Sequence, residues 1–217
     1  MLLRVITACL IMMFSFGISA ATDNDEKKVK LKETVNFEDG KYYQVLQEQI
    51  VPETVPLLKF FYFGCRACYQ ISPDLSKWSQ RTGTAISLVP LHGETSQVDA
   101  ARLFHTFAEM GVLGAMYELG YVIFQTEEVK LQGKERIDFY LDRHKVDKET
   151  FWQAWSSEAV KEKLRNSLAL SQKAAIHKTP GFVVRGKYLV KTEALASFDE
   201  LFELLTYLLN KKPAQTV

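Results

Sequence analysis

The sequence predicts an α/β fold with a mixed sheet, and three observations lead to this prediction. Short apolar or aromatic runs at residues 57–63 and 84–91 have the length and composition of buried strands. Apolar residues then recur at intervals of three and four over residues 96–175, which indicates several helices. Two further β-rich runs at residues 182–190 precede an amphipathic helix. This order of strands and helices is typical of an α/β domain.

Residues 57–63 are expected to form the central strand of the sheet. Residues 41–46 are a candidate edge strand, entered through a turn that contains a glycine. A helix is expected from Arg66 to about Arg81. We expect it to be bent or interrupted at Pro73, because the proline ring has no N–H to donate to the helix.

The block from residue 96 to residue 175 is predicted to consist of helices placed between strands. Asp147 followed by Thr150 is expected to open one of these helices. The simplest interpretation of the apolar and aromatic side chains with helical spacing is that they form part of the hydrophobic core. In the first half of the block they are Ala101, Phe104, Phe107, Ala108, Leu113, Met116, Tyr117 and Ile123.

The last part of the chain predicts a hairpin and a closing helix. Two β-rich runs, Phe182 to Arg185 and Tyr188 to Val190, are joined by a Gly-Lys pair, which favours a tight turn. Ser197, with a glutamate three residues later, has the pattern of a capping box at the start of a helix.

The first 20 residues have the features of a secretory signal. Arg4 is their single charged residue, an apolar stretch runs to about Ile18, and small residues follow at Ser19 and Ala20. A membrane anchor is the alternative, but the small residues and the polar residues behind them favour cleavage. The formal net charge of +1 is then that of Arg4, so the mature chain is neutral. Its balanced charge does not favour binding to nucleic acid or to an anionic membrane surface.

The cysteines indicate redox chemistry. Cys9 lies within the signal, so the mature protein keeps Cys65 and Cys68 at the junction between a strand and a helix. On one helical turn the two are close enough to form a disulfide, which is favoured in an exported protein. Cys65 lies where free backbone N–H groups and the positive end of the helix dipole point. That position favours the thiolate, which is the reactive form of cysteine.

Two motifs carry a resemblance to a known family. The sequence FFYFGCRACYQ holds the cysteine pair after an aromatic strand, and TPGFVVRGKY places a Thr-Pro before the hairpin. With the helical block and the signal, the chain resembles periplasmic DsbA-type thiol:disulfide oxidoreductases over nearly all of its mature length. This resemblance implies a thioredoxin fold formed by residues 21–95 and 176–217, with residues 96–175 inserted as a helical domain.

The resemblance also implies roles for individual residues. Cys65 would be the exposed nucleophile and Cys68 the buried resolving cysteine, with no cofactor besides their disulfide. Pro180 would be cis, and the backbone of Thr179 would pair with a substrate peptide as an added strand. Substrates would be reduced or unfolded exported proteins. A DsbB-like membrane oxidase linked to quinone would recycle the protein, which is expected to be periplasmic and monomeric.

Three residues near the cysteines raise questions about this mechanism. Ala67 stands where DsbA-type oxidases commonly hold a His that stabilises the thiolate, and Arg66 either supports the thiolate or lies in solvent. Lys59 occupies a position at which thioredoxin-like proteins often hold a buried acid. The favoured interpretation is that its amine snorkels to water. The alternative is a partly buried ammonium beneath Cys68, which favours a thiolate there at a desolvation cost.

The four histidines have separate interpretations. His177, two residues before Thr179, is the candidate neighbour of the disulfide, and a plain surface role is equally open. We expect His105 to be a satisfied core or boundary residue, His144 to lie on a solvated face and His92 to lie in a loop.

Several functions compete with a disulfide oxidase. A reductase or isomerase of the same fold is left open by Thr179, because oxidases of this family commonly carry Val there. The absence of a recognisable dimerisation region counts against an isomerase. Metal binding would need two of the scattered histidines beside the cysteine pair. A chaperone with a purely structural disulfide is a poor explanation, because so short a loop adds little stability. Oxidation of substrate dithiols is the predicted function.

Overall fold

A five-stranded mixed sheet organises the residues that the computed structural model describes, which are 36–93, 95–127 and 130–212. The strand order is β1-β5-β4-β2-β3, with β2 and β3 parallel and the other neighbours antiparallel. The signal predicted at residues 1–20 lies outside the described residues. The strands are β1 (Tyr43–Val45), β2 (Leu57–Phe61), β3 (Ile86–Pro90), β4 (Gly181–Val184) and β5 (Tyr188–Val190).

The expected mixed sheet is confirmed, but the predicted central strand is not central. β2 lies fourth in the order, and the middle position belongs to β4. β4 reaches this position because the hairpin, which is far along the chain, inserts between β1 and β2. β1 is an edge strand, as expected, and β3 forms the other edge.

Both faces of β2 are covered, and all five of its residues are buried. Because successive side chains of a strand point to opposite faces, the strand contributes to two separate parts of the core. Leu57 packs among residues of α1 (Arg66–Thr82) and α7 (Phe198–Asn210). Leu58 and Phe60 pack on the other face. Lys59 alternates with Leu58 and Phe60, so it points toward α1.

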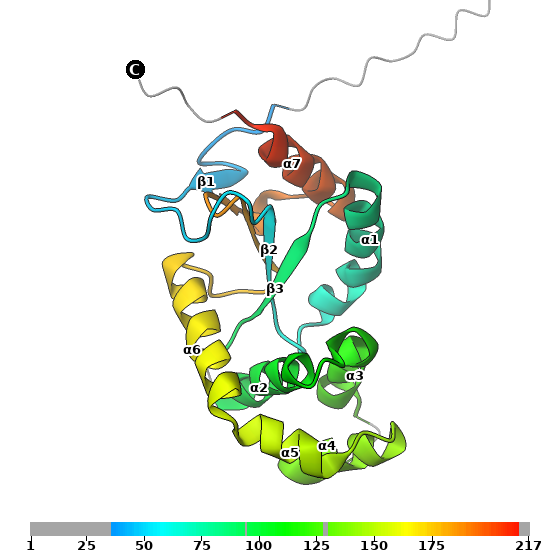
Figure 1. The fold of residues 1–217 in the computed structure, drawn as a ribbon. Helices are drawn as coiled ribbons and strands as arrows, with labels where there is room; N and C mark the ends of the chain where they lie inside the picture. The colour runs from blue at the N-terminus through cyan, green and yellow to red at the C-terminus, as the bar shows by residue number, and fades with distance from the viewer. Residues whose placement is uncertain (1–35, 94, 128–129, 213–217) are drawn as a thin grey trace, which may run out of the picture. The chain divides into compact units, whose positions relative to one another are not determined.

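α1 and α7 cover one face of the sheet together (Figure 1). The Trp78 ring of α1 stacks on Phe202 of α7, and its Nε1 donates to the Thr206 hydroxyl at 3.2 Å. α1 continues through Pro73, so of the two expected outcomes, a bend or an interruption, the interruption is wrong. It ends at Gly83, whose φ of 67° is the left-handed conformation in which glycine is favoured.

The predicted helical block is confirmed as five helices. Asp147 opens the fourth of them, and its carboxylate accepts from the Thr150 N–H at 2.8 Å, as expected for an N-cap. The five helices are α2 (Thr95–Glu109), α3 (Leu113–Gln125), α4 (Gly133–Arg143), α5 (Lys148–Ser156) and α6 (Glu158–Lys173). Of these, α2 packs against α3, α5 and α6.

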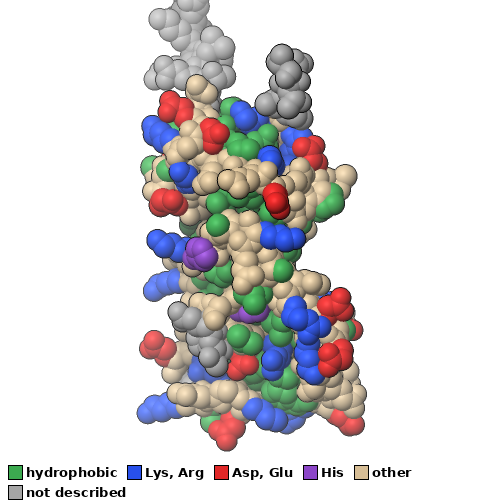
Figure 2. Space-filling model, turned by 90° about the vertical axis from the view of Figure 1, so that its left-hand side faces the viewer, with side chains coloured by type: hydrophobic (Ala, Val, Ile, Leu, Met, Phe, Trp, Pro, Cys, Tyr) green, Lys and Arg blue, Asp and Glu red, His purple; other side chains and the backbone are tan. Residues whose placement is uncertain are grey.

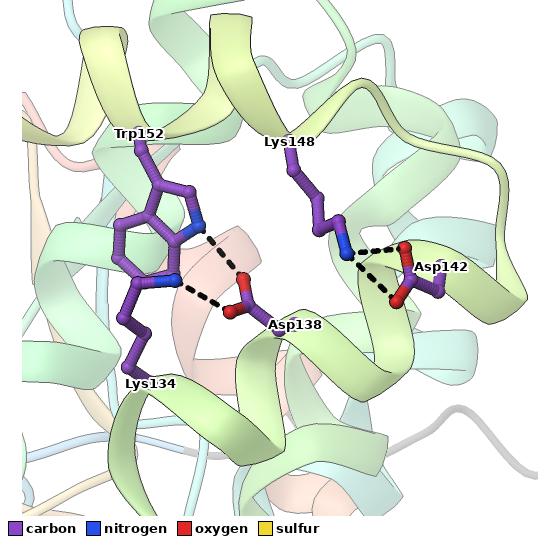
Figure 3. Close-up of polar contacts among 5 residues, drawn as sticks. All are labelled: Lys134, Asp138, Asp142, Lys148 and Trp152. Atoms are coloured by element: carbon purple, nitrogen blue, oxygen red, sulfur yellow. Dashed lines mark hydrogen bonds and ion pairs between the residues drawn. The ribbon is translucent and has the colours of Figure 1, made fainter.

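Polar side chains of α4 and α5 are in contact with one another (Figure 3). Asp138 accepts from the Trp152 indole N–H at 2.7 Å and from the Lys134 amine at 2.5 Å. Lys148 and Asp142 form a more exposed ion pair at 2.8 Å. Exposed pairs contribute only about 0–1 kcal/mol. The two helices are therefore held together by their buried apolar side chains, which are Ile137, Tyr140, Leu141 and Phe151.

The predicted hairpin and closing helix are both confirmed. β4 and β5 pair antiparallel through a turn in which Arg185 and Gly186 have φ of 50° and 64°. A Cβ at Gly186 would lie 2.3 Å from the Val51 carbonyl oxygen, so glycine is required there. A short 3-10 helix, η1 (Thr192–Ala194), follows. The Ser197 hydroxyl then caps α7 by accepting from the Glu200 N–H at 3.2 Å.

Charged side chains of both signs are interspersed on the face shown in Figure 2. This distribution agrees with a sequence that holds 27 basic and 26 acidic residues. Within the described part of the chain, none of the helices has both the length and the apolar character needed to span a membrane.

Candidate active site

The redox centre is a disulfide between Cys65 and Cys68 at the start of α1, with the two Cα atoms 5.2 Å apart. Cys65 is the N-cap residue, with extended backbone angles, and its Sγ accepts from the Cys68 N–H at 3.0 Å. The first turn of α1 contains no acidic side chain. Backbone N–H groups and the helix dipole therefore act on the Cys65 sulfur without an opposing carboxylate in that turn.

The two sulfurs differ in access. Cys68 is completely buried, with 0% of its surface exposed, whereas Cys65 is half-buried. Because a thiolate must reach the sulfur that it attacks, a thiolate that approaches from solvent meets Cys65 before Cys68. This difference matches the roles that the family resemblance implies for the two cysteines.

An aromatic layer and one glutamine position the segment that leads into the disulfide. The Phe63 ring meets that of Tyr121 of α3 edge-on, with centroids 5.1 Å apart. Gln125, the last residue of α3, donates through Nε2 to the Phe63 carbonyl at 2.7 Å and to the Cys65 carbonyl at 3.4 Å. Sequence reasoning missed Gln125, and nothing local singles it out, because its partner Phe63 lies 62 residues away.

Lys59 lies beneath the first turn of α1. Its Nζ donates to the Ser72 hydroxyl at 2.9 Å and to the Cys68 carbonyl at 3.4 Å, and the Ser72 hydroxyl donates to the same carbonyl at 2.6 Å. The residue is 1% exposed, so the favoured expectation that its amine snorkels to water is wrong. β2 is covered on both faces, and the side chain ends beneath α1, where almost none of its surface is exposed. Burial lowers the pKa of Lys59 to about 8.

Two tyrosines of α3 extend this polar group. The hydroxyls of Tyr117 and Tyr121 lie 3.1 Å apart. Burial raises the pKa of both, and hydrogen bonding to Ser72 partly offsets that effect. Tyr117 is packed in the aromatic core, as predicted from its spacing, but its polar contact and the role of Ser72 could not be predicted from the sequence.

The other predicted site residues lie around the disulfide motif or at the start of β4. Arg66 is exposed, as is His177, and neither side chain forms a hydrogen bond or ion pair with another residue of the described ranges. Ala67 is half-buried. The peptide bond between Thr179 and Pro180 is cis, and both residues are half-buried.

The remaining histidines match their expected placement in part. His105 is buried and hydrogen-bonded to the Ser167 hydroxyl at 2.8 Å, which confirms a satisfied core residue. His144 is exposed, which confirms the solvated position. His92 follows β3 in a loop, as expected, but is buried, with its Nε2 3.0 Å from the Leu164 carbonyl oxygen.

A small apolar cavity of about 180 Å³ adjoins Pro180. Its walls include Phe182 of β4, Leu195 after η1 and Phe198 at the start of α7. Phe198 is one of the large hydrophobic side chains that remain exposed. The lining suits an apolar group.

The sequence matches a family model described as "DSBA-like thioredoxin domain" over residues 65–203. The thiol:disulfide interchange protein DsbA of Pseudomonas aeruginosa is 26% identical over 216 residues, which cover 97% of this chain and 96% of that protein. The thiol:disulfide interchange protein DsbL of Escherichia coli is 26% identical over 197 residues, covering 81% and 88%.

Solved structures give the same result for the fold. The structure of Pseudomonas aeruginosa DsbA matches with a TM-score of 0.68 and 26% identity, covering 80% of this chain and 93% of that one. Proteus mirabilis DsbA, solved with a non-covalently bound peptide, matches with a TM-score of 0.69 at 18% identity, covering 81% and 100%. These likenesses confirm the expected thioredoxin fold with its helical insertion.

Proposed function

Because this chain belongs to the DSBA-like thioredoxin domain family and is a thiol:disulfide oxidoreductase, we propose that it oxidises the thiols of exported proteins in the periplasm. The observation that carries the proposal is the placement of the two sulfurs. Cys65 is reachable and receives an N–H at the start of α1, while Cys68 is buried behind it. The signal predicted at residues 1–20 supports export.

The reaction transfers two electrons from the substrate to the Cys65–Cys68 disulfide. A substrate thiolate attacks the Cys65 Sγ, which forms a substrate–Cys65 disulfide and releases Cys68 as a thiolate that takes up a proton. A second substrate thiolate then attacks the substrate sulfur of this mixed disulfide. The substrate leaves oxidised, and Cys65 leaves as a thiolate. Stabilising that thiolate favours the oxidising direction, because it makes Cys65 a better leaving group.

Two groups support the thiolates in this proposal. The N–H groups at the start of α1 act on Cys65, and the buried Lys59 ammonium lies beneath Cys68, whose carbonyl it contacts at 3.4 Å. Arg66 is exposed, so water screens its charge, and Ala67 offers no donor from its side chain. We assign His177 to the surface, not to the mechanism.

A peptide substrate would dock beside the cis Pro180. The backbone of Thr179 pairs with the extended peptide in this proposal, and the apolar cavity next to Pro180 receives one of its side chains. The peptide bound to Proteus mirabilis DsbA supports this class of ligand. The protein acts as a monomer whose redox-active disulfide is its only cofactor, and a DsbB-like, quinone-linked membrane oxidase reoxidises it.

The competing function is a reductase of the same fold, which Ala67 favours because it cannot supply the thiolate support of a histidine. The reduction potential against glutathione separates the two. An oxidase should approach the value of DsbA, about −120 mV, and a reductase that of thioredoxin, about −270 mV. We expect the first result, with a Cys65 pKa well below the ordinary value of about 8.5 by thiolate absorbance. A thioredoxin-like potential with an ordinary Cys65 pKa would overturn the proposal.

A further inference from the structure

A cavity of about 680 Å³ opens between α1, the edge strand β3 and α3. Its volume falls within the range of about 300–1,000 Å³ that is usual for small-molecule sites. Figure 1 shows α3 next to the first turns of α1, and the Tyr69 and Tyr121 rings of these two helices lie 5.2 Å apart. The cavity is separate from the apolar cavity beside Pro180, since the two share no lining residue.

Polar side chains from three elements meet in this cavity. Lys59 comes from β2, Ser72 from α1, and Tyr117 and Tyr121 from α3. All four can donate a hydrogen bond, and Lys59 adds a positive charge. The Ser72 hydroxyl uses its single hydrogen on the Cys68 carbonyl, so the donors left for a ligand are those of Lys59 and of the tyrosine pair.

The charge of Lys59 is not compensated within the described residues. None of their carboxylates forms an ion pair with it, and burial is the only cause of its lowered pKa. Glu118 also lines the cavity, but it is exposed, so water screens its charge. A buried ammonium without a counter-ion costs several kcal/mol, and a paired carboxylate offsets part of that cost.

The rest of the lining is mainly apolar. Leu75 comes from α1, and Ile86 and Leu88 come from β3. A bound molecule would therefore need one acidic group for the Lys59 end and an apolar body for these walls.

We propose that this cavity is a binding site for a small molecule that has one carboxylate and an apolar body, with the carboxylate against Lys59. The carboxylate accepts from the Lys59 amine and from the tyrosine hydroxyls, which are charge-assisted hydrogen bonds. The apolar body packs between Leu75 and β3. This site goes beyond disulfide exchange, and its occupancy does not depend on the direction in which the disulfide reacts.

The test compares three probes of nearly equal size, 4-phenylbutyrate, 4-phenylbutyramide and 4-phenylbutylamine. Each is titrated into the oxidised protein and followed by the chemical shifts of backbone amides. We expect 4-phenylbutyrate to bind about tenfold more tightly than the amide, as one charge-assisted hydrogen bond predicts, and the amine to bind most weakly. The shifts should be saturable and should include Ser72, Tyr117 and Tyr121.

Three variants locate the charge and the site. Lys59→Met should remove the preference for the carboxylate while the amide still binds. Lys77→Met removes an exposed lysine of α1, which is not part of the cavity lining, and should leave the preference unchanged. Ser76→Trp places a bulky ring at an exposed position of the lining and should weaken all three probes.

Equal binding of 4-phenylbutyrate and its amide would overturn the proposal, as would a preference that survives in Lys59→Met or the absence of saturable binding. None of these measurements uses disulfide exchange, so failure of the ligand site and failure of the oxidase function are distinguishable.

Discussion

The Lys59 side chain is itself a buried cation that contacts the first turns of α1. It has no carboxylate partner in the described part of the chain. Isolated buried charges are normally avoided, because desolvation costs more than a few hydrogen bonds return. Its hydrogen bonds to Ser72 and to the Cys68 carbonyl compensate only in part. The buried amine beside the redox centre therefore lowers the free energy of unfolding.

Lys59→Met should stabilise the oxidised protein by about 1–3 kcal/mol at pH 7. The folded-state pKa of about 8 lies below the ordinary value of 10.5. Between these pH values the unfolded chain binds more protons, so the stability of the wild type rises with pH across that window. The cost is fully present below pH 8, and the advantage of the variant should shrink toward pH 10.5. Urea unfolding at several pH values measures this.

Lys77→Met is the matched control for that experiment, because Lys77 is an exposed lysine on α1. It should change the free energy of unfolding by no more than about 0.5 kcal/mol. A Lys59→Met protein that is less stable than the wild type, or whose advantage is the same at every pH, would contradict the assignment of an uncompensated charge.

His105 should make the protein acid-sensitive between pH 6.5 and pH 4. Burial, followed by the charges of Lys163 and His92, lowers its pKa from 6.5 to about 4. The unfolded chain binds more protons in this window, so stability falls as the pH drops, by up to about 3 kcal/mol. His105→Gln should flatten this part of the urea-unfolding profile.

The exposed His144 is the control for this measurement, and His144→Gln should leave the slope between pH 4 and pH 6.5 as it is in the wild type. If His105→Gln keeps the full slope, carboxylates account for the acid sensitivity and the buried imidazole does not.

At the scale of elements, α3 connects the helical block to the disulfide. It carries the glutamine that holds the Phe63 and Cys65 carbonyls and the two tyrosines near Ser72. Close approach is possible because Gly120 faces the Phe63 ring, where a Cβ would lie 2.2 Å from a ring carbon. The inserted helices therefore support the active site directly.

Gly120→Ala should destabilise the protein by about 1–3 kcal/mol, because the added methyl forces the Phe63 ring or the helix to move. This loss should outweigh the helix propensity of alanine, which favours the substitution by up to about 1 kcal/mol. Gly114→Ala on the same helix meets nothing within 4 Å and should be neutral or slightly stabilising. Thermal and urea unfolding measure the stability of the two variants. Equal changes in the free energy of unfolding would show that the Phe63 ring can move aside without an energetic cost.

For the whole molecule, the disulfide lies between a helix start that stabilises an anion and a sheet that carries a buried cation. In the proposed mechanism both features favour the reduced protein, with Cys65 as a thiolate. A thermodynamic cycle links this preference to folding, because a strong oxidant is one whose reduced folded form is stabilised.

We therefore expect the reduced protein to unfold at a higher urea concentration than the oxidised protein. The difference should be about 1.4 kcal/mol for each 30 mV by which the folded protein is more oxidising than its unfolded chain. A Cys65→Ala, Cys68→Ala protein, measured with and without reductant, controls for effects of the reductant. Greater stability of the oxidised form would contradict the oxidising direction.

Several features could be predicted from the sequence because they depend on residues close together in the chain. Periodicity indicated the strands and the helical block, and Asp147 and Ser197 cap their helices through partners three residues away. The cysteine pair at the start of a helix is equally local. The interruption that was one of two expected outcomes at Pro73 does not occur, since helix packing against α7 outweighs the lost hydrogen bond.

The sequence by itself determined the α/β plan and the chemistry of the cysteine pair, since both follow from local pattern and spacing. Only the tertiary structure decided the strand order, the burial of Lys59 and its meeting with Ser72, and the approach of α3 to the disulfide. These features depend on contacts between distant segments, such as the pairing of Lys59 with Phe182 and the bond from Gln125 to Phe63. The energy of such contacts comes from burial and shape, which sequence periodicity does not record.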